Sequence, residues 1–327
     1  MSTRSQGSVA VALCFGLWAL PTMPDASAQA YPNRAIRIVV AFAPGGGTDA
    51  NARIVAQRLS EQLAVPVIVD NRPGAGSMLG TEIVARAAPD GYTLLLASSE
   101  FAVNPSLQPK IPYDTLRDFA PIAQTVSSQY VLTTHPSVPV KSVKEFIALA
   151  RARPGDLNYG SGGVGSASHL AGELLQMMTG TKLVHIPFKG AGPATIALMS
   201  GEVGFMFGST TAAVAAIKAG RVRAIAVTGP KRFSELPDVP TVAEAGVPGF
   251  VITGWFGLLA PASTPRAIIN RLGEEIVKVV RHPAVRERFA AVGTVPVESS
   301  PEEFAAFLGA EIERWSRVVK ASGARPL

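Results

Sequence analysis

The segment AFAPGGGTDA, residues 41–50, places three consecutive glycines between an apolar run and a helical pattern. The apolar run Ile36–Phe42 is typical of a buried β-strand, and the spacing of apolar residues in Asn51–Leu63 indicates an amphipathic helix. Glycine or small polar residues also stand at helix starts in PGAGS (73–77), GSGGVGSASH (160–169), KGAGP (189–193) and GSTT (208–211). A chain that repeatedly passes from strand to helix in this way favours an α/β architecture with mostly parallel sheets.

Short runs rich in Val, Ile, Leu and Phe alternate with helical patterns along most of the chain. The expected strands are Ile36–Phe42, Val67–Asp70, Thr93–Ala97, Val184–Phe188, Val203–Phe207, Ala224–Thr228 and Trp255–Leu259, with a shorter run at Leu157–Tyr159. The expected helices are Asn51–Leu63, Leu79–Ala87, Val143–Ala152, Ser168–Met178, Ala194–Met199 and Thr211–Ala219. From Pro265 onward the pattern is helical, which predicts an end that packs against one of the sheets. The length of 327 residues suggests two domains.

Residues 1–30 have the layout of a secretory signal peptide. Arg4 precedes the apolar stretch Val9–Leu20, and two prolines and the small residues Ala26-Ser27-Ala28 follow it. The apolar stretch is too short to span a bilayer of about 30 Å. We therefore expect cleavage after Ala28 or Ala30 and an exported, periplasmic protein. Cys14 is the single cysteine and would leave with the signal, so we expect no disulfide, thiolate metal site or cysteine nucleophile.

Several classes of partner are not expected from the composition. The net charge is +6, but the basic residues form scattered pairs mixed with acidic ones and without an aromatic stacking platform, so nucleic acid is not an expected partner. The four histidines include no pair at i, i+4, so no metal site is expected. The GxGxxG pattern at 160–165 lacks the acidic residue that dinucleotide binding requires about 20 positions later. We expect no cofactor.

The glycine-rich junctions predict an anion site. Helix starts leave backbone NH groups without partners, and glycine lets a ligand approach them closely. No Walker sequence follows Gly47, so phosphate is not favoured. Three side chains keep two interpretations: Asp49 caps the helix or orients the loop, His169 is structural or contacts the ligand, and Lys189 is solvated or faces the cleft.

Seven motifs occur in an order that resembles the substrate-binding proteins of tripartite tricarboxylate transporters, the Bug or TctC-like family, over residues 31–327. They are AFAPGGGTD (41–49), DNRPGAG (70–76), APDGYTLL (88–95), NYGSGGVGSASHLAGELL (158–175), HIPFKGAGPA (185–194), LPDVPTVAEAGVPGF (236–250) and WFGLLAPASTP (255–265). The resemblance implies a type II periplasmic binding protein fold, in which two α/β lobes surround a ligand cleft. Lobe 1 would comprise residues 31–130 and 254–327, and lobe 2 residues 131–253.

The resemblance also implies a receptor, not an enzyme, that captures a small carboxylate and delivers it to TctA/TctB-like integral membrane permease subunits. A monomer is expected. The residues assigned to ligand binding are Phe42, Pro44, Gly45, Gly46, Gly47, Thr48, Asp49, Ser98, Glu100, Phe101, Asn104, Ser161, Gly165, Ser166, His169, Lys189, Gly190, Ala191, Gly192, Gly208 and Ser209.

The sequence departs from the family pattern in the region expected to form the distal pocket. Gly204 and Gly208 stand where aspartate is common, and Phe101 stands where histidine is common, with Glu100 just before it. The loss of negative charge and the added aromatic surface lead to the hypothesis that the solute carries one carboxylate on a partly apolar, even aromatic, body.

Two other function classes stay open from the residues. A secreted hydrolase could be built from Ser161, Ser166, Ser168, His169 and Asp49, although no GxSxG elbow surrounds these serines and the neighbouring Ser168 and His169 cannot aim at each other. A ligand sensor that presents its closed form to a signalling protein would use the same binding chemistry as an uptake receptor.

Overall fold

The computed structural model of the protein describes residues 1–2, 31–108, 110–188 and 190–322. Residues 3–30, which make up nearly all of the predicted signal peptide, lie outside this part of the chain, as does Lys189.

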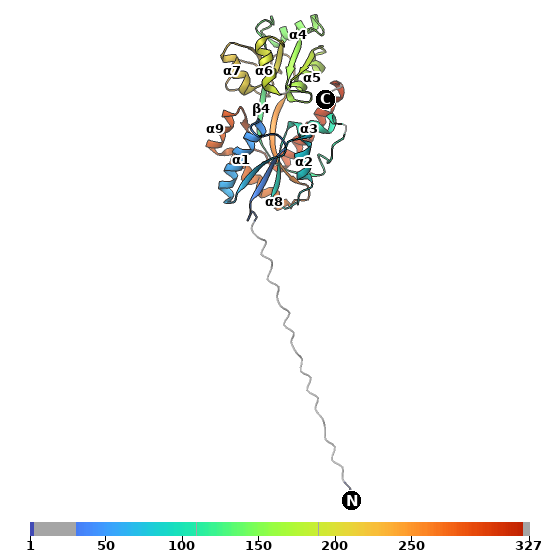
Figure 1. Cartoon of the computed structure of the whole chain (residues 1–327), viewed down its shortest axis with the longest axis vertical. Helices are drawn as coiled ribbons and strands as arrows, with labels where there is room; N and C mark the ends of the chain where they lie inside the picture. Colours follow the sequence, from blue (N-terminus) through green and yellow to red (C-terminus); the bar gives the residue numbers. More distant parts are fainter. Residues whose placement is uncertain (3–30, 109, 189, 323–327) are drawn as a thin grey trace.

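Two lobes are joined by two long strands, β4 (Phe119–Thr134) and β9 (Thr253–Pro261), which run between them (Figure 1). The two strands are antiparallel partners from Phe119 opposite Pro261 to Gln129 opposite Thr253. From Tyr130 onward β4 pairs instead with two strands of the other lobe. One strand therefore takes part in both sheets, and its partner changes between Gln129 and Tyr130.

The first lobe has the strand order β2-β1-β3-β9-β4, with β10 on the other side of β4. β1 is parallel to both β2 and β3, whereas β9 is antiparallel to β3. The remaining elements are β1 (Ile36–Val40), α1 (Gly47–Leu63), β2 (Val67–Asn71), a 3-10 turn (Ala75–Ser77), α2 (Met78–Ala85), β3 (Thr93–Ser98), α3 (Ser99–Leu107), α8 (Arg266–Arg281), α9 (Pro283–Ala291) and β10 (Val295–Pro296).

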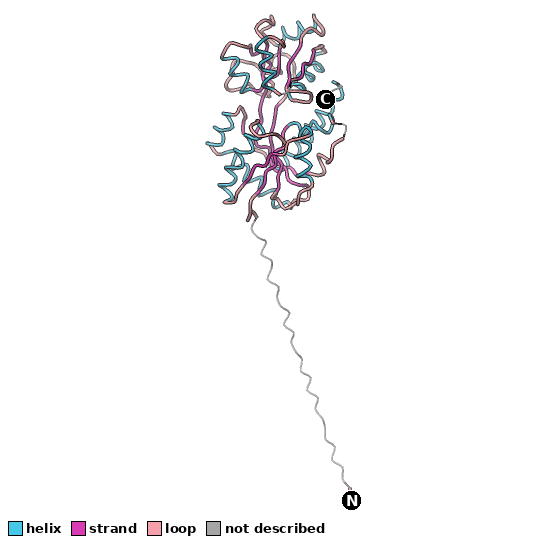
Figure 2. Tube along the Cα trace, in the orientation of Figure 1, coloured by secondary structure: helices cyan, strands magenta, loops and turns pink. Residues whose placement is uncertain are grey.

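The second lobe has the strand order β4-β7-β5-β6, and β8 pairs with β4. β5, β6 and β7 are mutually parallel, and both β7 and β8 are antiparallel to β4. The elements are α4 (Val143–Ala152), β5 (Asn158–Ser161), α5 (Ala167–Thr179), β6 (Val184–Pro187), α6 (Ala191–Ser200), β7 (Phe205–Ser209), α7 (Thr210–Lys218) and β8 (Arg223–Val227). Figure 2 shows the helices of both lobes in cyan and the strands in magenta.

The last helix, α10 (Pro301–Ser322), packs against elements of both lobes. Its apolar residues Phe304, Leu308 and Trp315 belong to the same buried cluster as Leu170 of α5 in lobe 2. The Arg314 guanidinium also donates a 2.7 Å hydrogen bond to the Val251 carbonyl, in the segment that leads into β9. The predicted helical end is confirmed, and it contacts α5 as well as lobe 1.

The expected strands and helices are confirmed in order, with ends that shift by a few residues, whereas β4, β10 and α3 were not predicted. The sequence PIAQTVSSQYVLTT mixes polar and apolar residues without a period of two. Its pairing register shifts at three places and its partners change half-way along. Each change alters which face is buried, so the alternation typical of a strand is lost.

Candidate functional site

The strand register brings the predicted junctions to the boundary between the lobes. In lobe 1 the C-terminal residue of β3, Ser98, lies opposite Phe256, near the start of β9, and the parallel strands β1 and β2 end on the same side. In lobe 2 the C-terminal residue of β7, Ser209, lies opposite Tyr130, where β4 crosses over, and β5 and β6 run parallel to β7. Ligands of open α/β sheets bind outside such carboxyl ends. The junctions therefore face one another across the boundary.

The loop before α1 offers backbone NH groups that have no protein acceptor. Pro44, Gly45, Gly46 and Gly47 are exposed, and α1 begins at Gly47. The Asp49 carboxylate accepts the Gly45 NH at 2.9 Å. Within the described residues, no acceptor lies against the NH groups of Gly46, Gly47 or Thr48. These groups point out of the first helical turn and are suited to bind an anion.

Asp49 orients this loop from inside the protein. Its side chain is 4 % exposed and also accepts hydrogen bonds from the Arg53 guanidinium and the Asn71 amide, both at 3.0 Å. The Arg53 hydrogen bond, helped by those from Gly45 and Asn71, lowers the pKa of Asp49. Of the two interpretations of Asp49, the structure supports loop orientation, since its carboxylate is fully used by protein donors.

The junction between β3 and α3 separates its residues into two groups. The Ser98 hydroxyl donates to the Glu100 carboxylate at 2.7 Å, and Glu100 is half-buried at the boundary. Phe101, in contrast, is 2 % exposed, and its ring packs edge-on against Phe119 at 5.1 Å between centroids. Successive helical residues are rotated by about 100°, so Phe101 points into the core when Glu100 points out. The structure therefore places the Phe101 ring in the core, and its role in ligand binding stays a prediction.

Asn104 is also a structural residue. It is buried, and its amide donates to the Gly76 carbonyl at 2.9 Å and to the Ser77 hydroxyl at 3.2 Å. The side chain thus holds the turn before α2 against α3. Its role in ligand binding stays a prediction.

The loop before α5 differs from the loop before α1 because its own side chains accept its NH groups. The Ser168 hydroxyl accepts the Gly162 NH, the Ser161 hydroxyl accepts the Gly163 NH, and His169 Nδ1 accepts the Gly165 NH, each at 3.1 Å. The Ser166 hydroxyl donates to the Gly163 carbonyl at 2.7 Å. The loop is a closed network of its own hydrogen bonds.

Two histidine rings lie beneath this loop. His169 and His185 are stacked with 4.0 Å between ring centroids, and His185 Nε2 lies 2.5 Å from the Ser161 hydroxyl. Burial, with the neighbouring His185 as a smaller cause, lowers the pKa of His169 to about 4, and burial lowers the pKa of His185 to about 4. The neutral His169 ring accepts the Gly165 NH, so the structural interpretation of His169 is supported.

Gly165 is buried at a contact between the lobes. Its φ is +79°, and a side chain at this position would collide with Leu107 of α3. A second contact between the lobes joins the Thr210 hydroxyl to the Gly293 carbonyl at 3.2 Å. Gly165 therefore lets the lobes approach and is not an open NH donor.

The start of α6 is the part of lobe 2 that most resembles the open loop of lobe 1. Gly190 is half-exposed and has φ +112°, and Ala191 and Gly192 are exposed. The N-cap residue is Gly190, so this position has no side chain that could cap the helix. Ser209 before α7 is exposed as well, whereas Gly208 is buried and pairs with Val131 of β4. Lys189 lies outside the described residues.

Gly204 lies far from these junctions. It precedes β7, at the opposite end of that strand from Ser209, and its NH donates to the Asn158 side chain at 2.7 Å. Its proposed influence on the distal pocket is therefore wrong.

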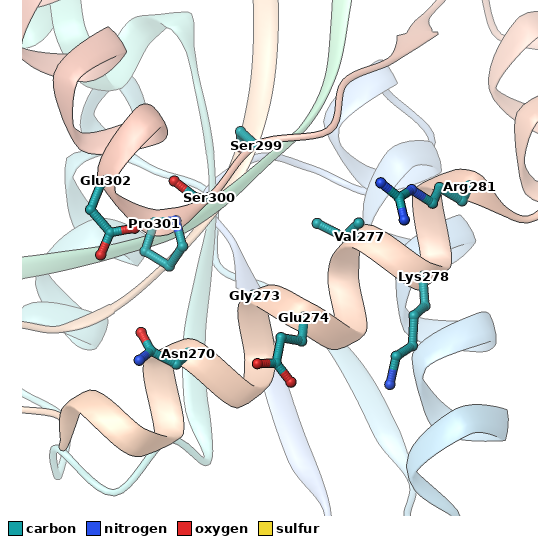
Figure 3. Close-up of a pocket in the computed structure, with 10 residues that line it drawn as sticks. All are labelled: Asn270, Gly273, Glu274, Val277, Lys278, Arg281, Ser299, Ser300, Pro301 and Glu302. Carbon is teal, nitrogen blue, oxygen red and sulfur yellow. The ribbon is translucent and has the colours of Figure 1, made fainter.

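The hollow shown in Figure 3 lies outside the interlobe boundary, between α8 and the start of α10. Its volume is about 580 Å³, and its charged lining residues lie along one side of α8, together with Glu302 at the start of α10. Several of these charges are already paired, as in Lys278 with Glu275, Arg281 with Glu298 and Arg266 with Glu302. Both basic side chains that line the hollow, Lys278 and Arg281, are therefore paired, and the hollow does not favour an anion.

Sequence reasoning missed the partners that complete these networks. His185 begins the motif HIPFKGAGPA but is not among the predicted site residues, and it lies in β6 directly opposite Tyr159 of β5. Asn71 and Arg53 were not singled out although both hold Asp49. The expected parallel pairing of neighbouring strands was the one signal that could have indicated these contacts, because it places residues of adjacent strands side by side.

The chain matches the tripartite tricarboxylate transporter family receptor, TctC, over residues 51–324. It belongs to this family. Protein BugT of Bordetella pertussis is 42 % identical over 301 residues, which cover 91 % of this chain and 92 % of that protein. The family is one of periplasmic binding proteins and receptors, not of enzymes.

Two solved relatives were determined with ligands. Rpa4515 of R. palustris with adipate is 34 % identical, with a TM-score of 0.78 and coverage of 91 % of this chain and 100 % of that one. MatC (Rpa3494) from Rhodopseudomonas palustris with bound malate is also 34 % identical, with a TM-score of 0.74 and coverage of 88 % and 100 %. These likenesses confirm the α/β periplasmic binding protein fold.

The structure also bears on the hydrolase alternative. It brings Ser161 to His185, but the Ser161 side chain is 0 % exposed and its oxygen is held by the Gly163 backbone and the imidazole. A buried hydroxyl of this kind cannot reach a substrate, in agreement with the family of receptors. Among residues 31–108, 110–188 and 190–322, no three His, Asp or Glu side chains gather as a metal site would require, and no helix there could cross a membrane.

Proposed function

We propose that this protein captures a small carboxylate between its two lobes and delivers it to TctA/TctB-like integral membrane permease subunits. The observation that carries the proposal is the set of unpaired NH groups at Gly46, Gly47 and Thr48, which face the boundary from lobe 1. A carboxylate is an acceptor-only group and is favoured at the positive end of a helix dipole. The relatives solved with adipate and malate support a carboxylate ligand.

The second wall of the proposed site is the start of α6. Ala191 and Gly192 are exposed there, and their NH groups stand at the positive end of a helix in lobe 2. A ligand favours closure of two lobes only through contacts that improve in the closed state. Donors on both sides of the boundary satisfy this condition, and we include Lys189 to Gly192 in the proposed site on the strength of the family resemblance.

The aromatic-body hypothesis loses the support of two of the three residues on which it rested, and Gly208 alone keeps its place at the end of β7. Phe101 packs in the core, and Gly204 lies at the remote end of β7. We therefore propose a site for small mono- or dicarboxylates without a requirement for an aromatic ring. We also propose that residues 1–30 are a signal peptide and that the protein acts as a monomer in the periplasm.

A thermal-shift screen of the mature protein tests the ligand class. The panel contains mono-, di- and tricarboxylates, aromatic acids, and neutral amides of matched size as controls. We expect at least one carboxylate to raise the melting temperature, since a ligand that binds only the folded state stabilises it. Failure of all carboxylates, or stabilisation by the matched amides, would contradict the proposal.

Capture on immobilised protein from detergent-solubilised membranes tests the partner. Membranes that contain TctA/TctB-like subunits should yield those subunits more strongly when the ligand is present. Recovery of a signalling protein in their place would favour the ligand-sensor alternative.

A further inference from the structure

We infer that Phe256 makes the proposed site selective for ligands in which the carbon next to the bound carboxylate is apolar, because its phenyl ring covers that carbon. The inference rests on the proposed function, since it assigns the specificity of the same site. Three features of the described residues carry it: the distance from the ring to the open loop, the partial exposure of the ring, and a pair of hydroxyl groups further along the same face.

The Phe256 ring lies against the loop that offers the open NH groups. The tip of the ring, Cζ, is 3.9 Å from the position that a Cβ atom would occupy at Gly47. Gly47 is the first residue of α1, and its NH group has no acceptor among the described residues. A carboxylate bound by this NH group therefore has the ring beside it, and the next carbon of the ligand lies within van der Waals reach of the ring.

Phe256 is half-buried, whereas the residues on either side of it in β9 are buried. Its strand is paired on both edges, with Ser98 of β3 and Val126 of β4 opposite Phe256. The backbone that carries the ring is therefore fixed at the centre of a sheet, and the tip of the ring lies beside an exposed residue, Gly47. Covering the exposed part of the ring with the carbon chain of a ligand removes apolar surface from water, which favours binding.

The same face of the crossing strands carries two hydroxyl groups beyond the ring. Gly254 lies two residues before Phe256 and therefore shares its face of β9. A Cβ atom at Gly254 would lie 2.5 Å from Ser128 Oγ and 2.8 Å from the Tyr130 hydroxyl oxygen, so both groups lie over this glycine. Both side chains are half-buried. Since two residues of a strand span about 7 Å, the face changes from apolar to polar over that distance.

The position of a hydroxyl group on the ligand should therefore decide its affinity. A hydroxyl on the carbon next to the carboxylate would give up its hydrogen bonds to water and face a phenyl ring, which offers no comparable partner. An unsatisfied polar group of this kind lowers affinity by about tenfold or more. A hydroxyl at the far end of the ligand passes the ring and reaches Ser128 and Tyr130.

Isothermal titration calorimetry with positional isomers tests the inference. The compounds 2-hydroxyhexanoate and 6-hydroxyhexanoate have the same formula and charge, and they differ in whether the hydroxyl stands beside the carboxylate or at the far end. We expect 6-hydroxyhexanoate to bind about tenfold more tightly. Succinate should likewise bind about tenfold more tightly than tartrate, which carries a hydroxyl next to each carboxylate and cannot avoid the ring by binding in the reverse direction.

Three variants assign the preference to the ring. Phe256→Asn supplies an amide that can pair with a hydroxyl and should reduce the preference within each pair to less than about threefold. Phe256→Leu keeps an apolar side chain and should retain the preference. Tyr92→Asn changes a half-buried aromatic residue of the same buried cluster, directly before β3 and at the opposite end of that strand from Ser98, and should leave it unchanged. Circular dichroism establishes that each variant is folded, and the wild-type comparison tests the inference without any variant.

The outcomes separate this inference from the proposed function. Equal affinities within either pair, or tighter binding of the compound with the adjacent hydroxyl, would overturn the inference and leave the proposed function in place. An unchanged preference in folded Phe256→Asn would also overturn it, because the ring would then act only in the core. Failure of all four compounds to bind would overturn the inference, and failure of the wider carboxylate panel as well would overturn both.

Discussion

The loop before α1 and the loop before α5 have similar sequences but opposite hydrogen-bonding states. In the first, one NH group is accepted by Asp49 and those of Gly46, Gly47 and Thr48 have no acceptor among the described residues. In the second, three glycine NH groups are accepted by Ser161, Ser168 and His169. A glycine-rich turn at a helix start is therefore a ligand site only where nearby side chains leave its NH groups unoccupied.

The largest effect is expected when the open loop is blocked. Gly46 has φ −83°, and a Cβ placed there would have its nearest neighbour, the Ala43 carbonyl, at 3.9 Å, so Gly46→Leu fits the free protein. The new side chain would cover the NH groups and remove several charge-assisted hydrogen bonds. We expect affinity for the best carboxylate of the panel to fall by at least about 1000-fold, or about 4 kcal/mol. Titration calorimetry measures the loss.

The control for this variant is Gly309→Leu, at an open position on α10. Both variants should stay folded: leucine in the interior of α10 should raise the free energy of unfolding by about 0.5–1 kcal/mol, and loss of the glycine N-cap of α1 should lower it by about 1 kcal/mol. Normal ligand affinity in Gly46→Leu would show that the ligand binds elsewhere.

The second effect concerns the closed loop and its histidines. The unfolded chain takes up protons near the ordinary histidine pKa of about 6.5. Folded His169 and His185 do so only near pH 4, since burial lowers the pKa of each ring to about 4. The contribution of each buried ring to the free energy of unfolding should therefore be fully present above pH 6.5. It should be lost as the pH falls from 6.5 to 4, by about 3 kcal/mol for one ring.

Urea unfolding at several pH values measures this slope. His169→Asn keeps an acceptor near the Gly165 NH but cannot titrate, so the slope should become shallower. His135→Asn changes a histidine paired with Ser137 away from the loop and serves as the control. An unchanged slope in His169→Asn would show that the His169 ring does not cause the pH dependence of the free energy of unfolding.

The third effect concerns the side chain that orients the open loop. Asp49→Ala removes the acceptor of Gly45, Arg53 and Asn71 and should lower the free energy of unfolding by about 2 kcal/mol. Affinity should fall by about tenfold, because the loop is no longer held in its binding conformation. Glu82→Ala breaks an exposed pair on α2 and should cost less than about 0.5 kcal/mol. Undiminished affinity in Asp49→Ala would mean that the loop holds its shape without this carboxylate.

The smallest effect is expected in the closed loop, at Ser168→Ala. The Gly162 NH loses its acceptor, and the free energy of unfolding should fall by about 1 kcal/mol. Affinity should change by less than about threefold, since the α5 loop is not a main donor of the proposed site. Chemical denaturation and calorimetry provide the two measurements, and Ser200→Ala at the end of α6 is the control. A loss of affinity as large as that of Gly46→Leu would abolish the distinction between the two loops.

The sequence was most informative where a local pattern determines the structure. The apolar run of β1 is buried except for Arg37, and the apolar spacing of α8 predicts the face with which Ile269, Leu272 and Ile276 enter the core. The helix breaks at His282, where Pro283 begins α9, as expected for proline in a first turn. The positions of the junctions could be predicted for the same reason.

The sequence was least informative where distant segments meet. β4 has no regular alternation of polar and apolar residues because it changes partners at Tyr130. One of these partners, β9, lies more than a hundred residues further along the chain. Phe101 looked like a pocket residue beside Glu100, but the phase of α3 turns it toward Tyr113 and Phe119. Neither outcome can be derived from the residues next to it.

The amino-acid sequence by itself determined the alternation of strands and helices, the family, and the places where glycine exposes the backbone at a helix start. Only the tertiary structure decided which of those backbone NH groups remain free, since their acceptors come from neighbouring turns and strands that the sheet register brings together. Hydrogen bonds are short-range, so a separation of a few ångströms between side chain and loop distinguishes an anion site from a structural turn.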